Sequence, residues 1–99
     1  MTGFIDQLFT LGGRRAVVTG GNAGIGLAMA TALGRAGASL LLVARREAEL
    51  AQAAAGLRAQ GIAADHLALD LGHTDTQPAA GAAILKRAGQ VDILVNAAG

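Results

Sequence analysis

The sequence contains no cysteine, tryptophan or tyrosine, and only two of its 99 residues are phenylalanine. Without cysteine, the chain can form no disulfide, no thiolate nucleophile and no thiolate metal site. With so few aromatic rings, the core must consist of small aliphatic side chains, which suit close packing of helices on a sheet. The net charge of +1 gives no electrostatic reason to expect nucleic acid or an anionic membrane as a partner.

Long hydrophobic segments are also missing. The longest apolar runs fall far short of the ~20 residues that span a bilayer. Residues 1–13 lack the basic start and unbroken apolar stretch of a signal peptide. We therefore expect a cytoplasmic protein without a membrane partner. Within residues 1–13, helical spacing of Phe4, Ile5, Leu8 and Phe9 predicts an amphipathic leader that packs on the main body, with a partner-binding arm as the alternative.

Strand and helix patterns alternate from Arg15 onward. The predicted strands are residues 16–19, 39–44, 66–70 and 91–96. The predicted helices are residues 25–36, residues 47–60, and a third that Thr74, Gln77 and Pro78 begin and that ends near Ala88. This order predicts an α/β fold, a Rossmann-type doubly wound parallel sheet of about four strands with helices on both faces. The expected inward side chains are Ile25, Met29, Ala32, Leu33 and Ala36 on the first helix, and Leu50, Ala54 and Leu57 on the second.

Four glycines lie within residues 20–26, between the first strand and the first helix. Gly20 would permit a sharp turn, Gly24 would leave the helix amides open to a phosphate, and Gly26 would let the helix pack closely on the sheet. The start of a helix offers unpaired N–H groups and roughly half a positive charge. At the carboxyl edge of a parallel sheet, this turn predicts a pyrophosphate site. A phosphate loop of the kind found in nucleoside triphosphatases is not expected, because it needs a lysine after its last glycine, where Leu27 stands. A purely structural glycine turn is the alternative to a pyrophosphate site.

The second predicted strand ends in Arg45 and Arg46, at the distance where an NAD site usually has an acidic residue. Guanidinium groups can bind a phosphate bidentately, and a carboxylate would repel it. The sequence therefore favours NADP over NAD as the cofactor, although NAD stays possible. The alternative is that these arginines only solvate a helix start.

Three motifs together resemble the short-chain dehydrogenase/reductase family. The stretch TGGNAGIG at residues 19–26 is similar to that family's T-G-x-x-x-G-x-G turn, and Asp70-Leu71 to its acidic position after the third strand. The stretch NAAG at residues 96–99 resembles its N-N-A-G motif, with Ala97 in place of the second asparagine. The resemblance covers residues 14–99 and implies an NAD(P)-binding Rossmann half that stops after its fourth strand.

The resemblance also implies residue roles. The glycine turn would hold ribose and pyrophosphate, Arg45 the 2′-phosphate, Asp70 and Leu71 the adenine, and residues 96–99 the ribose next to the nicotinamide. Arg46 is a second candidate for the 2′-phosphate. For Asp70, capping of the following turn is the alternative. Ala23 stands where members with firm NADP preference often carry a basic residue. The full set of candidate cofactor-binding residues is Gly20, Asn22, Ala23, Gly24, Ile25, Gly26, Arg45, Arg46, Asp70, Leu71, Asn96, Ala97, Ala98 and Gly99.

No catalytic residue and no metal ligand is predicted within the chain. The resemblance implies that catalysis in this family depends on a tyrosine, a lysine four residues later and a serine. This chain has no tyrosine, and its only serine, Ser39, begins a strand at the edge of the predicted sheet opposite the cofactor. We predict a parent enzyme that moves hydride between NADP(H) and an alcohol or carbonyl, as a homo-oligomer, and that the 99 residues alone are inactive. A non-catalytic dinucleotide-sensing module and an inactive truncated product are the alternatives. Other polar residues for which we expect no chemistry are His66, His73, Lys86 and Asp92.

Overall fold

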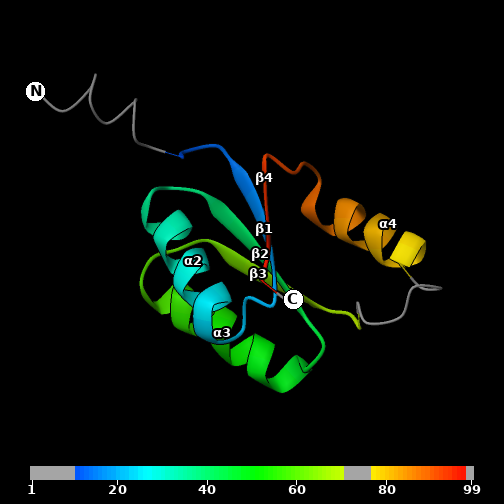
Figure 1. Ribbon diagram of the computed structural model, residues 1–99. Helices are drawn as coiled ribbons and strands as arrows, with labels where there is room; N and C mark the ends of the chain where they lie inside the picture. Colours follow the sequence, from blue (N-terminus) through cyan, green and yellow to red (C-terminus); the bar gives the residue numbers. More distant parts are fainter. Residues whose placement is uncertain (1–10, 71–76, 98–99) are drawn as a thin grey trace, which may run out of the picture.

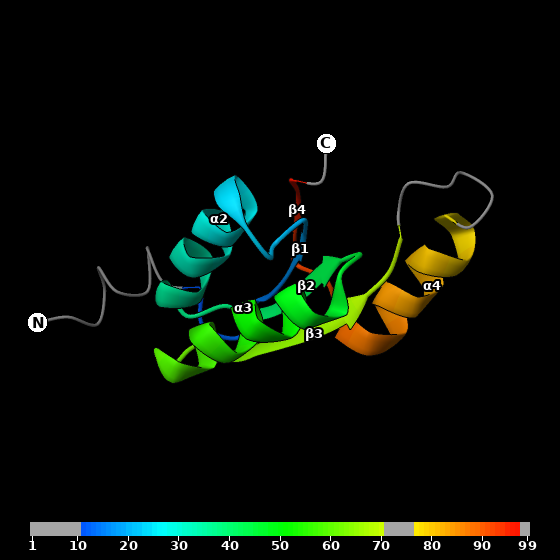
Figure 2. The same ribbon diagram turned by 90° about the horizontal axis from the view of Figure 1, so that it is seen from below.

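A four-stranded parallel sheet lies between helices in the computed structural model, which describes residues 11–70 and 77–97 (Figure 1). The strand order is β3-β2-β1-β4, so β1 and β2 are the inner strands of this sheet. The elements are β1 (Arg15–Thr19), α2 (Gly24–Arg35), β2 (Ser39–Ala44), α3 (Glu47–Ala59), β3 (Ala64–Ala68), α4 (Gln77–Ala88) and β4 (Ile93–Asn96). Helices α2 and α3 cover one face and α4 the other (Figure 2), which confirms the predicted doubly wound fold. None of the helices in these two ranges is long and apolar enough to cross a bilayer.

Several predictions fall outside the described ranges. They are the leader apart from residues 11–13, the capping residue Thr74, His73, and the candidate site residues Leu71, Ala98 and Gly99.

The two inner strands are apolar along their whole length because both of their faces are buried. Val18, Leu40 and Leu42 point into the core under α2 and α3. Val17, Leu41 and Val43 point into a second core on the face that α4 covers. All six side chains are fully buried, as expected for inner strands of a parallel sheet with helices on each side.

The third strand begins and ends two residues earlier than predicted, at Ala64 and Ala68 instead of 66 and 70. Its register is set by β2, which pairs Leu40 with Ala64 and Ala44 with Ala68. Because β2 ends at Ala44, residues beyond 69 have no strand beside them on that side. The apolar pattern alone could not locate this limit, since it depends on the neighbouring strand. The fourth strand likewise begins at Ile93, two residues later than predicted.

The predicted inward face of the first helix was wrong for most of its residues. Gly26 and Ala30 are the buried residues of α2, whereas Ile25 is 76% exposed and Met29 42% exposed. The helix lies so close to the sheet edge that glycine and alanine, and not the larger side chains, fit between them. Of the expected residues, Ala32 is also exposed and Leu33 packs against the core. On α3 the prediction is confirmed, because Leu50, Ala54 and Leu57 are its buried residues.

An ion pair joins β3 to α4. The Arg87 guanidinium donates to both carboxylate oxygens of Asp65, from Nε at 2.7 Å and from a terminal nitrogen at 3.0 Å. This hydrogen bonding, with a further bond from the backbone N–H of His66, lowers the pKa of Asp65 to about 2. The pair is half exposed, with 48% of the Arg87 side chain and 39% of the Asp65 side chain accessible to solvent.

We expect Asp65→Asn to lower the free energy of unfolding by about 0.5–1 kcal/mol at neutral pH, a modest value because solvent screens the pair. The pKa of Asp65 is lower in the folded than in the unfolded chain. The stabilisation is therefore complete above the ordinary value of 3.8 and disappears as the pH falls toward 2. Urea unfolding across this pH range measures the difference, with Arg87→Gln and the double variant closing a thermodynamic cycle. An equal cost of Asp65→Asn at pH 2 and pH 7 would contradict this account.

Candidate functional site

The turn between β1 and α2 is built on two glycines with positive φ. Gly20 has φ of +73° and Gly24 has φ of +59°, a backbone conformation that residues other than glycine rarely adopt. The N–H of Gly20 donates to the carbonyl oxygen of Val43 at 2.7 Å, which ties the turn to the end of β2. The sharp turn predicted at Gly20 is therefore present.

Gly26 brings α2 into direct contact with this turn. A Cβ atom added at Gly26 would overlap the carbonyl oxygen of Gly20 and would lie 3.2 Å from the Cβ of Ala97. The close approach that the sequence indicated is thus between α2, the glycine turn and the residue after β4. Any side chain at position 26 would push α2 away from the carboxyl ends of β1 and β4.

The N-terminus of α2 has the features of an anion site. Its N-cap residue, Ala23, has no side chain that can bond the first amides, and the first turn holds no acidic residue. In contrast, the first turn of α3 contains Glu47 and Glu49. None of the described residues lies within 4 Å of a Cβ built on Gly24. The positive end of α2 therefore has neither a capping side chain nor a compensating acid of its own, and no residue that the structure describes fills the space beside Gly24.

Charged residues follow the end of β2 beside this helix. Arg45 is exposed and makes no hydrogen bond or ion pair with the residues that the structure describes. Arg46 pairs with Glu49 at 3.4 Å, and the Nδ2 of Asn22 donates to the other oxygen of Glu49 at 3.3 Å. The two candidate arginines thus differ, since only Arg46 has a carboxylate partner here.

The end of β4 is fixed to the end of β1. The hydroxyl of Thr19 donates to the Oδ1 of Asn96 at 2.9 Å, and the N–H of Ala97 donates to the carbonyl oxygen of Thr19 at 3.0 Å. Thr19 is only 6% exposed. This link holds Asn96 and Ala97 beside the glycine turn.

The strand register brings most candidate residues to one edge. Thr19 pairs with Val43 and with Asn96, and β2 and β3 end opposite each other at residues 44 and 68. The glycine turn, the two arginines and Ala97 therefore follow neighbouring strand ends, and Asn96 is the last residue of β4. The first turn of α2 and the end of β4 lie on the same side of the molecule (Figure 2). Asp70 is exposed and lies two residues beyond β3.

Three residues that shape this edge were missing from the predicted site. Gly21 is buried, and a Cβ there would lie 2.9 Å from a methyl group of Leu42. The sequence predicted Thr19 only as the first residue of the TGGNAGIG motif, and Glu49 only as a residue of the second helix. The glycine cluster contained a signal for Gly21, but the contacts of Glu49 depend on tertiary structure.

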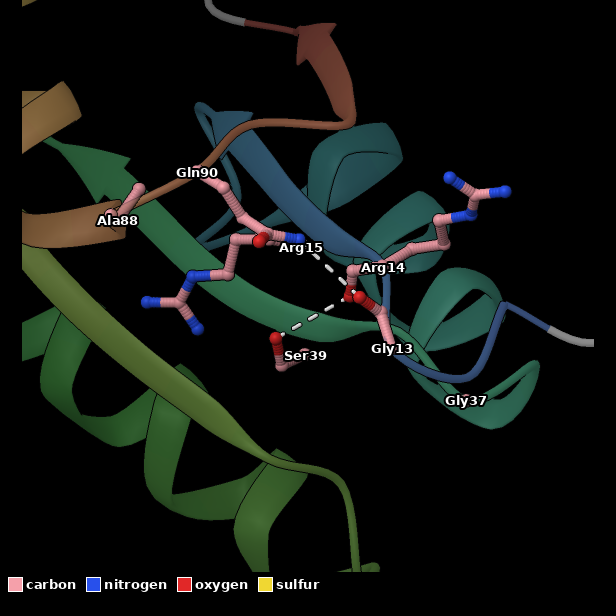
Figure 3. Close-up of a pocket in the computed structure, with 8 residues that line it drawn as sticks. Gly13, Arg14, Arg15, Gly37, Ser39, Ala88 and Gln90 are labelled. Atoms are coloured by element: carbon pink, nitrogen blue, oxygen red, sulfur yellow. Dashed lines mark hydrogen bonds between the residues drawn. The ribbon is translucent and has the colours of Figure 1, made fainter.

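A hollow of about 450 Å³ lies at the opposite edge of the sheet (Figure 3). It is lined by Gly13, Arg14, Arg15, Gly37, Ser39, Ala88, Gly89 and Gln90, which confirms that Ser39 is remote from the glycine turn. Ligands of open parallel sheets bind outside the carboxyl ends of the strands, not here.

Asp92 stabilises this amino edge. Its carboxylate accepts hydrogen bonds from the N–H of Arg15 at 2.8 Å and from the side chain of Gln90 at 2.7 Å. These bonds, with the nearby charge of Arg14, hold the pKa of Asp92 below its ordinary value. The carboxylate therefore has a structural role, as expected for a residue at a strand start. Within residues 11–70 and 77–97, no three histidine, aspartate or glutamate residues gather as they would around a metal ion.

These features define the class of the domain: a Rossmann-type nucleotide-binding half with its glycine turn at the carboxyl edge. The profile of the short chain dehydrogenase family matches residues 14–99. The chain therefore belongs to the short-chain dehydrogenase family.

Individual relatives are 35% to 41% identical to the chain over the aligned residues. Gluconate 5-dehydrogenase of Gluconobacter oxydans is 41% identical over 93 residues, which are 94% of this chain and 36% of that protein. L-Sorbose reductase of Gluconobacter frateurii, solved with NADPH and L-sorbose, superposes with a TM-score of 0.81 at 36% identity, over 92% of this chain and 35% of that one. The RhlG/NADP active-site complex of Pseudomonas aeruginosa gives a TM-score of 0.81 at 35% identity, over 89% and 35% of the two chains. The chain thus spans about a third of the length of these relatives.

Proposed function

We propose that the chain is the cofactor-binding part of an oxidoreductase that uses NADP(H) and acts on an alcohol/carbonyl pair. The observation that carries this proposal is the N-terminus of α2, with no capping side chain and no acid in its first turn, beside an open position at Gly24. Diphosphate oxygens can accept hydrogen bonds from such N–H groups and are stabilised by the helix dipole. When bound, the dinucleotide supplies the hydride chemistry, and the protein orients it.

The other residues of this edge have the roles that such a cofactor needs. The guanidinium of Arg45, which has no partner among the described residues, is suited to a 2′-phosphate, which supports NADP over NAD. Asp70 and Leu71 are proposed to bind the adenine, and residues 96–99 the ribose next to the nicotinamide. Asn96 is suited to this role because Thr19 holds its side chain in place.

The remaining parts of the proposal rest on relatives and on composition. Two relatives are named for gluconate and L-sorbose, so keto-sugars and sugar acids are the first substrates to test. Since the 99 residues contain no tyrosine, we propose that the catalytic acid–base group lies in a longer parent chain. We further propose that this parent is a cytoplasmic homo-oligomer and that residues 14–99 form one folding unit, preceded by a leader.

The test measures NADPH consumption by the full-length protein with a panel of keto-sugars and simple ketones, beside titration of NADPH binding. We expect turnover with at least one carbonyl class, and none for the 99 residues alone. NADPH binding by the full-length protein without turnover on any carbonyl would favour the non-catalytic dinucleotide-sensing module. Turnover by the 99-residue chain itself would contradict the proposed division of roles.

A further inference from the structure

Glu49 connects the glycine turn to the arginines that follow β2. One of its carboxylate oxygens accepts from the Asn22 side chain at 3.3 Å, and the other from the Arg46 guanidinium at 3.4 Å. The preceding residue, Arg45, has a guanidinium with no such partner among the described residues. Of the two arginines that are candidates for a 2′-phosphate, Glu49 therefore already pairs with Arg46.

We propose that Glu49 determines the choice between NADP and NAD by withholding Arg46 from the 2′-phosphate. This inference rests on the proposed function. A carboxylate and a 2′-phosphate compete for the same guanidinium. NAD carries a neutral hydroxyl at that position, so Glu49 weakens NADP binding and leaves NAD binding nearly unchanged. The protein then prefers NADP through Arg45 and still accepts NAD.

Glu49→Gln separates this charge effect from a structural role. The glutamine keeps an oxygen that can accept from Asn22, so the glycine turn keeps its connection to α3. Its neutral amide no longer holds Arg46, which becomes available to the phosphate. A residue that acted only as a structural link would show little change on this substitution, or would change binding of both dinucleotides together.

The chain offers a matched control on the same helix turn. Glu47 is also in the first turn of α3, but its carboxylate is 2.9 Å from the His66 ring and makes no hydrogen bond to the glycine turn among the described residues. Glu47→Gln removes the same charge from the same helix end, so it reports the change in helix dipole compensation and net charge without freeing Arg46.

The experiment titrates NADP and NAD into the full-length protein by calorimetry, in the absence of any substrate. For Glu49→Gln we expect NADP to bind about two- to fivefold more tightly, because the exposed Glu49–Arg46 pair is weak. We expect NAD binding to change less than about 1.5-fold, and the NADP gain to be smaller at high salt. For Glu47→Gln we expect a distinctly smaller change in the NADP:NAD ratio. In the double variant Glu49→Gln/Arg46→Gln, the gain in NADP affinity should disappear, because Arg46 is the group that is released.

Two results would overturn the inference while leaving the proposed function intact. One is an unchanged NADP:NAD ratio in Glu49→Gln, and the other is the same gain in Glu47→Gln. If the unsubstituted protein binds neither dinucleotide, the proposed function fails and this inference fails with it.

Discussion

Replacing Gly26 with alanine is expected to weaken dinucleotide binding by tenfold or more and to lower the free energy of unfolding by about 1–3 kcal/mol. The added methyl group would overlap the Gly20 carbonyl oxygen and crowd Ala97. Because both neighbours are backbone or short side chains, no flexible group can move aside, so α2 must shift away from the turn. That shift would move the first amides of α2 away from the proposed diphosphate. Urea unfolding and NADP titration of the full-length protein measure the two effects.

Gly56→Ala is the matched control for this substitution. Gly56 lies inside α3, and no residue in the described ranges is within 4 Å of a Cβ built there. Alanine should stabilise α3 by about 0.5–1 kcal/mol relative to glycine, and NADP binding should not change. If Gly26→Ala bound NADP as tightly as Gly56→Ala, the contact between α2 and the glycine turn would have no role in cofactor binding.

Arg45→Asp should reverse cofactor preference, changing the NADP:NAD affinity ratio by about 100-fold in favour of NAD. A unit charge about 4 Å from another changes the energy by about 1–4 kcal/mol, depending on screening, and this substitution changes the charge near the 2′-phosphate by two units. NAD has no phosphate there, so most of the effect falls on NADP. Parallel titrations with the two dinucleotides give the ratio directly.

Arg35→Asp makes the same change in net charge at a remote position. Arg35 is the last residue of α2, about 16 Å along the helix from Gly24. It should alter the NADP:NAD ratio only slightly, because solvent and salt screen exposed charges over that distance. Equal ratios in Arg45→Asp and in the unsubstituted protein would remove Arg45 from the proposed site.

The order of elements and the glycine turn could be predicted because both depend on local sequence. Apolar runs identify the strands, and apolar residues at helical spacing identify the helices. The positive φ angles at Gly20 and Gly24 favour glycine whatever the surrounding tertiary structure. The same locality explains why Leu50, Ala54 and Leu57 were correctly placed inside. Each of these features follows from a few neighbouring residues.

Features set by contacts between distant segments could not be predicted. The limits of β3 depend on its pairing with β2, so the sequence of β3 alone misplaced them by two residues. The inward face of α2 depends on how closely the helix approaches the glycine turn, which favours Gly26 and Ala30 over Ile25. The contacts of Glu49 with Asn22 cross 27 residues of sequence. An acidic residue in a first helical turn gives no sign of them.

The most direct test of the central claim is a crystal structure of the full-length protein with NADP at saturating concentration. The account predicts diphosphate oxygens within about 2.7–3.2 Å of backbone N–H groups in the first turn of α2, at residues 24–26. A diphosphate bound elsewhere in the molecule, or no dinucleotide at the carboxyl edge of the sheet, would contradict it.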